Sequence, residues 1–309
     1  MLSYCLSTTN LPPICHEELT SFATVILAVQ FSTTEPIASQ AFAPTGLVKH
    51  YMVERAATAI VIDGHLDEFA WQATAQINGF DRILHSYNQV LYSTRARMLW
   101  DDENLYVAFV CQDPNMWATY ENEDDPLWEE EVVEVFIDPD GDGRNYLELE
   151  VNPHNTVVDL NIVQLRPSWK ANKDWDAAGL KTAVETQGTA NDSLDQDQGW
   201  TVEIAIPWAA MAAGIGGGGR PDAGDMWRLN LYRIERKAGW EALRQIRSLR
   251  AQIEQMTPAL GEAQQEQLQE QLSRLTAHFE DQTEYTAWSE TYQRGFHHPE
   301  RFGMVQFAQ

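Results

Sequence analysis

The stretch DPLWEEEVVEVFID, Asp125–Asp138, places one indole, Trp128, inside an acidic run that leads into an alternating apolar segment. The alternation predicts a strand on which Glu134 and Phe136 share one face. An indole beside carboxylates suits a sugar, because the ring covers the C–H face of a pyranose while carboxylates accept its hydroxyl protons. The alternative is a solvated acidic loop before an ordinary strand. In either case we expect Glu129–Glu131 to be solvated loop charge.

Similar alternating runs, bounded by turn residues, recur through the rest of the chain. The strands predicted in this way are 57–63, 94–100, 105–112, 132–138, 145–152, 156–163, 200–208 and 226–236. A short helical turn is expected at 66–74. Many short strands separated by turn signals predict an all-β fold, a β-sandwich of the jelly-roll or immunoglobulin-like type.

One segment, 239–281, has helical instead of strand periodicity. Its apolar residues recur at helical spacing, and they are Leu243, Ile246, Leu249, Ile253, Met256, Leu260, Leu268, Leu272, Leu275 and Phe279. Pro258 favours a break, so we expect a helical hairpin inserted between two strands, or one kinked helix. Two roles stay open for the apolar stripe. It covers itself against the sandwich, or it serves self-association or the docking of a partner.

The N-terminal part, 1–52, is expected to be a leader or a disordered tail, followed by one β-sandwich domain at 53–309. Residues 22–31, FATVILAVQF, have the length of a signal-peptide apolar region, although no Lys or Arg precedes Lys49. One interpretation is export to an extracytoplasmic or secreted location, and the other is a mis-started N-terminus. No apolar run approaches the ~20 residues that span a bilayer.

The composition restricts the partners. The net charge is −25, which argues against nucleic acid and anionic membranes, because a phosphate backbone needs a basic surface. A neutral polar ligand or a cation fits better. The 11 Trp are a high count, typical of surfaces that stack on ring-shaped ligands. The 3 Cys do not make a disulfide framework, and Cys111 in its apolar run is expected to be a buried small hydrophobe.

Five segments, taken in order, resemble the family 9 carbohydrate-binding modules. They are IDGHLDEFAW (62–71), MLWDDENLYVAFVCQDP (98–114), PLWEEEVVEVFID (126–138), WTVEIAIPW (200–208) and FHHPERFGMVQF (296–307). The resemblance covers 57–237 and 284–307, and it leaves out the leader and the helical segment. It implies a β-sandwich that binds oligo- or polysaccharide, notably at reducing ends, by clamping a sugar ring between two aromatic side chains.

The resemblance also implies site residues. The first aromatic falls on Trp128 and the second on Phe296, where well-known members have Trp; Phe296 could instead anchor the C-terminal strand. The family carboxylate falls on Glu134, whose alternative is a solvent-facing strand residue. An Arg that contacts sugar in the best-known members is Glu150 here, so the site is expected to read a different sugar or to bind a cation. His297 could line the same site.

The turn DPDGDG at 138–143 resembles a calcium loop. Asp138, Asp140 and Asp142 would supply hard oxygen ligands to a hard cation. The twelfth position of such a loop is Leu149 and not Glu, so the alternative is a hairpin turn that uses Asp and Gly for their backbone freedom. Calcium is therefore an optional ligand in this hypothesis, and no other cofactor is required.

We therefore predict non-catalytic carbohydrate binding in polysaccharide metabolism. One alternative is a polysaccharide-active glycoside hydrolase or its accessory subunit, since any two of many carboxylates can meet the spacing that hydrolysis needs. Neither a Gly-x-Ser-x-Gly elbow nor zinc-like His and Cys spacing is present in the sequence. Another alternative is a protein-interaction adaptor that acts through 239–281.

Overall fold

The structure is a computed structural model that describes residues 47–84, 89–256 and 261–309. All of them belong to one unit, Ser39–Gln309. The expected leader lies almost wholly outside the described residues, as does its apolar segment 22–31. None of the helices in the described ranges is long and apolar enough to cross a bilayer.

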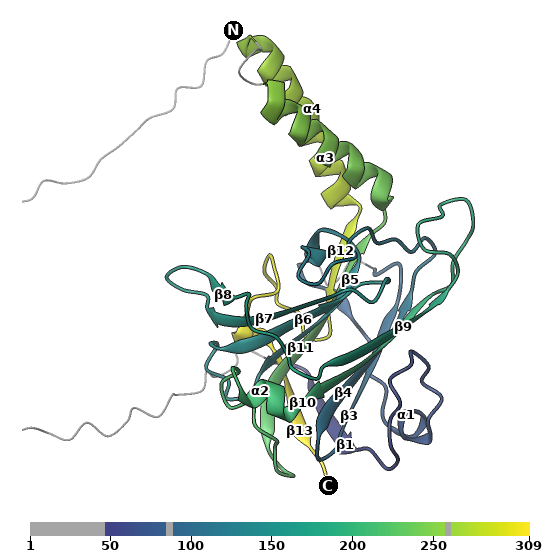
Figure 1. Ribbon diagram of the computed structural model, residues 1–309, viewed down its shortest axis with the longest axis vertical. Helices are drawn as coiled ribbons and strands as arrows, with labels where there is room; N and C mark the ends of the chain where they lie inside the picture. Colours follow the sequence, from purple (N-terminus) through teal and green to yellow (C-terminus); the bar gives the residue numbers. More distant parts are fainter. Residues whose placement is uncertain (1–46, 85–88, 257–260) are drawn as a thin grey trace, which may run out of the picture. The chain divides into compact units, whose positions relative to one another are not determined.

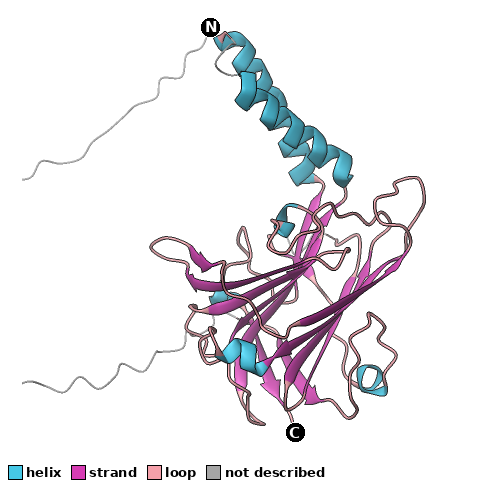
Figure 2. Cartoon of the chain, viewed as in Figure 1, coloured by secondary structure: helices cyan, strands magenta, loops and turns pink. Residues whose placement is uncertain are grey.

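Strands dominate the described chain (Figure 2). They are β1 (His50–Arg55), β2 (Asp81–Arg82), β3 (Thr94–Trp100), β4 (Asn104–Gln112), β5 (Val132–Asp138), β6 (Tyr146–Val151), β7 (Val157–Gln164), β8 (Lys170–Asn172), β9 (Lys181–Gln187), β10 (Gly199–Pro207), β11 (Met226–Arg236), β12 (Thr283–Ala287) and β13 (Gly303–Phe307). The short helices are α1 (Phe69–Ala73), η1 (Leu127–Glu129), α2 (Trp208–Ala212) and η3 (Pro299–Arg301).

The strands form one large mixed sheet in the order β8-β7-β6-β5-β11-β13-β1-β3-β4-β10-β9, and β12 pairs with β11 and β2. Strand β1 is parallel to both of its neighbours, β13 and β3, and so joins the two halves of the sheet. The halves form two layers in Figure 1, with β5, β6 and β7 in one and β3, β4 and β10 in the other. This is the layered β architecture that the alternating runs predict.

The main hydrophobic core lies between the two halves. Val133, Val135 and Ile137 of β5 meet residues such as Val107 and Phe109 of β4 there, and all five are fully buried. Cys111 belongs to the same core, as the apolar run around it predicts. Each strand of a sandwich has a second face, and on β5 that face carries Glu134 and Phe136.

The bounds of β3, β5 and β11 are those that alternation predicts, and most other predicted strands are displaced by only a residue or two. The strand predicted at 57–63 is wrong. The segment lies in no strand, and side chains accept the N–H groups of Val61 and Asp63: Val61 N donates to Glu68 Oε1 at 2.9 Å, and Asp63 N donates to Glu203 Oε2 at 3.0 Å. The strand of this region is β1, which begins at His50, before the expected domain boundary at 53.

Two long helices, α3 (Gly239–Met256) and α4 (Glu262–Asp281), fall within the segment of helical periodicity. They run side by side in Figure 1 and extend away from the strands. Leu243 and Ile246 of α3 and Phe279 of α4 pack with Trp117, near the strands at their base. Among the described residues of the apolar stripe, Leu243, Ile246, Leu249, Ile253 and Phe279 are buried, whereas Leu268, Leu272 and Leu275 are half-buried. Residues 257–260 between the helices are outside the described part.

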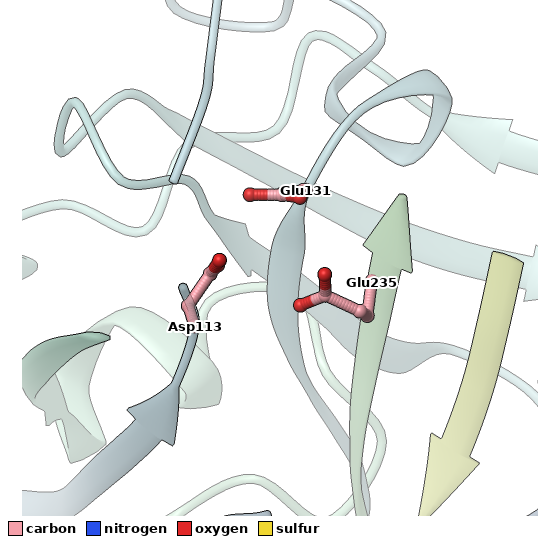
Figure 3. Close-up of side chains that lie close together, drawn as sticks. All are labelled: Asp113, Glu131 and Glu235. Atoms are coloured by element: carbon pink, nitrogen blue, oxygen red, sulfur yellow. The ribbon is translucent and has the colours of Figure 1, made fainter. Parts of the chain in front are cut away.

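A second buried feature joins the two layers. Asp113, Glu131 and Glu235 point toward one another (Figure 3), with carboxylate oxygens within 4.8 Å. Arg233 lies among them, with Nη2 3.1 Å from Asp113 Oδ2, and it also pairs with Glu235. The expectation that Glu129–Glu131 are solvated is wrong for two of the three. Glu130 and Glu131 are fully buried because their oxygens accept backbone N–H groups of residues 117–120.

We expect Glu235→Gln to flatten the pH dependence of stability. Burial first, and Asp113 next, raise the pKa of Glu235 from 4.5 to about 8, while Arg233 and Lys237 oppose the shift and Glu284 adds to it. The native state then binds more protons than the unfolded state between these values, so the free energy of unfolding falls as pH rises through them. A shift of this size is worth on the order of a few kcal/mol.

Urea unfolding between pH 5 and pH 8 measures this slope. The matched control is Glu254→Gln, which removes an exposed carboxylate on α3 and is expected to leave the slope of the wild type. Equal slopes in Glu235→Gln and the wild type would contradict the raised pKa of Glu235.

Candidate functional site

A cavity of about 710 Å3 lies over the face of β5, β6, β7 and β11 that is turned away from the main core. Its lining includes Trp128, Glu134, Phe296 and His297, four residues that the sequence singles out from widely separated segments. The fifth, Glu150, lies beside Glu134. The structure therefore brings all the expected ligand residues to one place, although their roles differ from one another.

Trp128 forms part of the wall. It belongs to η1, where its neighbour Leu127 is fully buried and anchors the turn, and its own carbonyl oxygen accepts Arg236 Nη2 at 2.9 Å. The indole remains 39% exposed, and Lys173 Nζ lies 5.8 Å from its ring centroid. A fixed backbone with an accessible ring is the arrangement that stacking on a ligand requires.

Phe296 is much less accessible, at 7% exposed. Its ring stacks on Tyr232 with centroids 4.1 Å apart and planes 14° apart, and its carbonyl oxygen accepts the Tyr232 hydroxyl at 2.9 Å. Phe136 meets it edge-on. One face of Phe296 is thus occupied by the protein, which favours the anchor role for this side chain.

Trp169 is a lining residue that the sequence analysis missed. It lies in the loop between β7 and β8, its indole is 48% exposed, and its ring centroid is 6.3 Å from that of His297. The signal was an isolated Trp in a polar loop, followed directly by Lys170. Together with Trp128 it gives the cavity two accessible indoles.

Three carboxylates lie at the floor of the site. Glu134 and Glu150 face each other across β5 and β6, and Glu148 is on the same face of β6 two residues earlier. Glu134 is 2% exposed, so it is not the solvent-facing strand residue of the alternative reading. Burial raises the pKa of all three, and for Glu148 it raises the pKa to about 8. The neighbouring carboxylates add to the shift: Glu148 raises the pKa of Glu134 further, and Glu134 and Glu148 raise that of Glu150.

His297 adds a neutral polar group. Its Nδ1 is 2.6 Å from the Tyr146 hydroxyl, and its Nε2 is 3.7 Å from Glu148 Oε2. Burial first, and His298 next, lower the pKa of His297 to about 4. At neutral pH the imidazole is uncharged, so it offers one hydrogen-bond donor and one acceptor.

The acidic turn at 138–143 joins β5 to β6, and its carboxylates bind its own backbone. Gly143 N donates to Asp138 Oδ2 at 3.0 Å, and Arg144 N donates to Asp142 Oδ1 at 2.8 Å. Oxygens of Asp138, Asp140 and Asp142 also lie within 4.8 Å of one another. The arrangement is compatible with both the turn and the cation interpretations. Leu149 is buried in the main core and contributes no ligand.

Comparison with known proteins finds a matching family model and similar segments in two enzymes. A family model described as carbohydrate family 9 binding domain-like matches residues 62–309. Endo-1,4-beta-xylanase A of Thermotoga neapolitana is 29% identical over 152 residues, and exoglucanase XynX of Acetivibrio thermocellus is 31% identical over 159 residues. These matches cover 48% and 50% of this chain but 12% of each relative.

The fold is also similar to that of a solved structure. A protein of Bacteroides uniformis described as carbohydrate-binding superposes with a TM-score of 0.56 at 14% identity, over 84% of this chain and 99% of that one. Sequence identity this low limits the similarity to the fold.

We expect Phe296→Ala and Trp128→Ala to differ in stability. Removing the buried, stacked Phe296 leaves a cavity and should lower the free energy of unfolding by about 3–5 kcal/mol. Removing the accessible indole of Trp128 should cost about 1 kcal/mol or less. Chemical unfolding of both variants measures the two values, and a larger loss for Trp128→Ala would reverse the two roles.

Proposed function

The chain belongs to the carbohydrate family 9 binding domain-like family, whose function is non-catalytic carbohydrate binding, and we propose that the cavity beside Trp128 holds the sugar. One observation carries this proposal. A single cavity combines two accessible indoles, Trp128 and Trp169, with the buried carboxylates Glu134 and Glu148. Apolar walls and convergent polar groups are what a pyranose, with its apolar faces and hydroxyl rim, requires.

The energetics follow from the same features. An indole that covers a sugar face removes apolar surface from water, which contributes roughly 25 cal/mol per Å2. The hydroxyls then need partners to replace the water they lose, and Glu134, Glu148 and neutral His297 offer them. A cavity of about 710 Å3 accommodates a short sugar segment and not a long chain. We therefore infer weak to moderate affinity, on the order of micromolar to millimolar.

The relatives suggest which glycans to consider. They are named as an endo-1,4-beta-xylanase and an exoglucanase, and the similar segment is a small part of each. We propose that this chain binds β-1,4-linked polysaccharide or oligosaccharide, as an accessory module to an enzyme that acts on it. An extracytoplasmic location follows from this proposal, because such polysaccharides lie outside the cytoplasm.

Calcium in the turn after β5 is a separate part of the proposal. Asp138 Oδ1 is buried and accepts no hydrogen bond among the described residues, and Asp140 and Asp142 bring oxygens within 4.8 Å. Burial raises the pKa of Asp138 to about 7, so a bound cation would be needed to keep it ionised throughout the neutral range. Bound there, calcium would stiffen the turn.

Hydrolysis is the second candidate function, because Glu134 and Glu148 lie together in a cavity of sugar size. Glycoside hydrolysis needs one ionised carboxylate as nucleophile or base beside a protonated one. Burial raises the pKa of each of the two, which disfavours the ionised carboxylate that hydrolysis needs as nucleophile or base. Reducing-sugar release from xylan or cellulose by the pure protein would establish hydrolysis instead.

We expect Trp128→Ala and Trp169→Ala each to weaken binding to xylo- or cello-oligosaccharides by about tenfold or more, since about 1.4 kcal/mol of stacking is a factor of ten. Isothermal titration calorimetry measures the affinity. Phe69→Ala is the matched control, because Phe69 is an exposed aromatic on α1 outside the cavity lining. Unchanged affinity in both Trp variants would exclude this cavity as the sugar site.

A further inference from the structure

The carboxylates of Glu134, Glu148 and Glu150 form a cluster, which we call the floor cluster. One oxygen from each lies within 4.8 Å of the others. Strand register sets this proximity, because Glu134 and Glu150 are directly paired and Glu148 is the next residue on the same face of β6. The cluster borders the cavity, whose lining includes Glu134 and Glu148.

The floor cluster has unused hydrogen-bonding capacity. Glu150 is fully buried, and neither of its carboxylate oxygens has a hydrogen-bond partner in the described chain. Glu134 Oε1 and Glu148 Oε2 are likewise buried and accept no hydrogen bond there, although His297 Nε2 lies 3.7 Å from Glu148 Oε2. Buried carboxylate oxygens are costly unless a hydrogen-bond donor or a cation satisfies them. Four such atoms in one place point to a ligand of positive charge.

Nearby basic side chains do not fill this role. Arg236 donates to Glu280 Oε1, Thr283 Oγ1 and the carbonyl oxygen of Trp128, each at about 3 Å. Lys173 lies over the ring of Trp128. The cluster in Figure 3 is different, because Arg233 there pairs directly with two of its three carboxylates.

We propose that Glu134, Glu148 and Glu150 hold a calcium ion at the floor of the cavity, and that hydroxyls of the bound sugar complete its coordination. Oxygens that ligate one calcium ion at 2.3–2.6 Å can be at most about 5 Å apart, and the observed spacing satisfies this limit. Calcium takes about six to eight oxygens, which is more than the three supplied when each carboxylate contributes one oxygen. The open cavity leaves room for a pair of sugar hydroxyls.

Burial favours the protonated form of these carboxylates, and a cation that binds them displaces their protons. The contact between the ion and the sugar rests on the function proposed above, whereas the binding of the ion by the three carboxylates does not.

The first measurement is calorimetric titration of calcium chloride alone into the chelator-treated full chain. We expect the wild type to bind one calcium ion more than Glu150→Gln, whatever the turn at 138–143 binds. Glu235→Gln, which alters the cluster that Arg233 neutralises, should bind as many ions as the wild type. Glu148→Gln serves as a second variant if Glu150→Gln does not fold. Equal ion counts in the folded floor-cluster variant and the wild type would overturn the ion site.

The second measurement needs no variant. Oligosaccharide affinity of the wild type is compared in calcium and in EGTA, and we expect it to fall by about tenfold or more in EGTA. Equal affinity in the two buffers overturns the calcium-mediated contact and leaves sugar binding established. No binding in either buffer overturns the proposed function, and the ion count then decides the ion site by itself.

Discussion

Three carboxylates buried on one face of the β5–β6 strand pair are the constraint on which the site depends. A carboxylate without a partner is costly to remove from water, yet Glu134, Glu148 and Glu150 lie on the strand face that carries the second hydrophobic cluster. The segments that enclose them come from far apart in the sequence: the turn that carries Trp128, the loop that carries Trp169, and the chain before the last strand. Strand register fixes the floor, and these segments create the cavity above it.

The fold was largely predictable from the sequence, because strand alternation reports which side chains enter the core. β3, β5 and β11 have the predicted bounds. The segment 57–63 has the same alternation but lies in no strand, and Glu203, from a distant part of the chain, accepts the N–H of Asp63 at its end. No local pattern reveals such a contact.

The residues that the sequence singles out lie together in the structure, but their different environments did not follow from the sequence. Sequence resemblance pointed to Trp128, Glu134, Phe296 and His297, and they do line one cavity. It could not show that one face of the Phe296 ring stacks on Tyr232, or that the Trp169 indole is exposed in the cavity, because both depend on tertiary packing. It also gave no sign that Glu130 and Glu131 are buried, since the sequence of an acidic run is the same whether its carboxylates contact water or backbone amides.

The central claim is that a sugar ring lies between the indole wall and the carboxylate floor. A crystal structure of the chain with a xylo- or cello-oligosaccharide tests it most directly. The account predicts a sugar ring against the face of Trp128, with a hydroxyl within ~3 Å of an oxygen of Glu134 or Glu148, or joined to them through a cation. A sugar bound elsewhere on the chain, with this cavity holding only solvent, would contradict it.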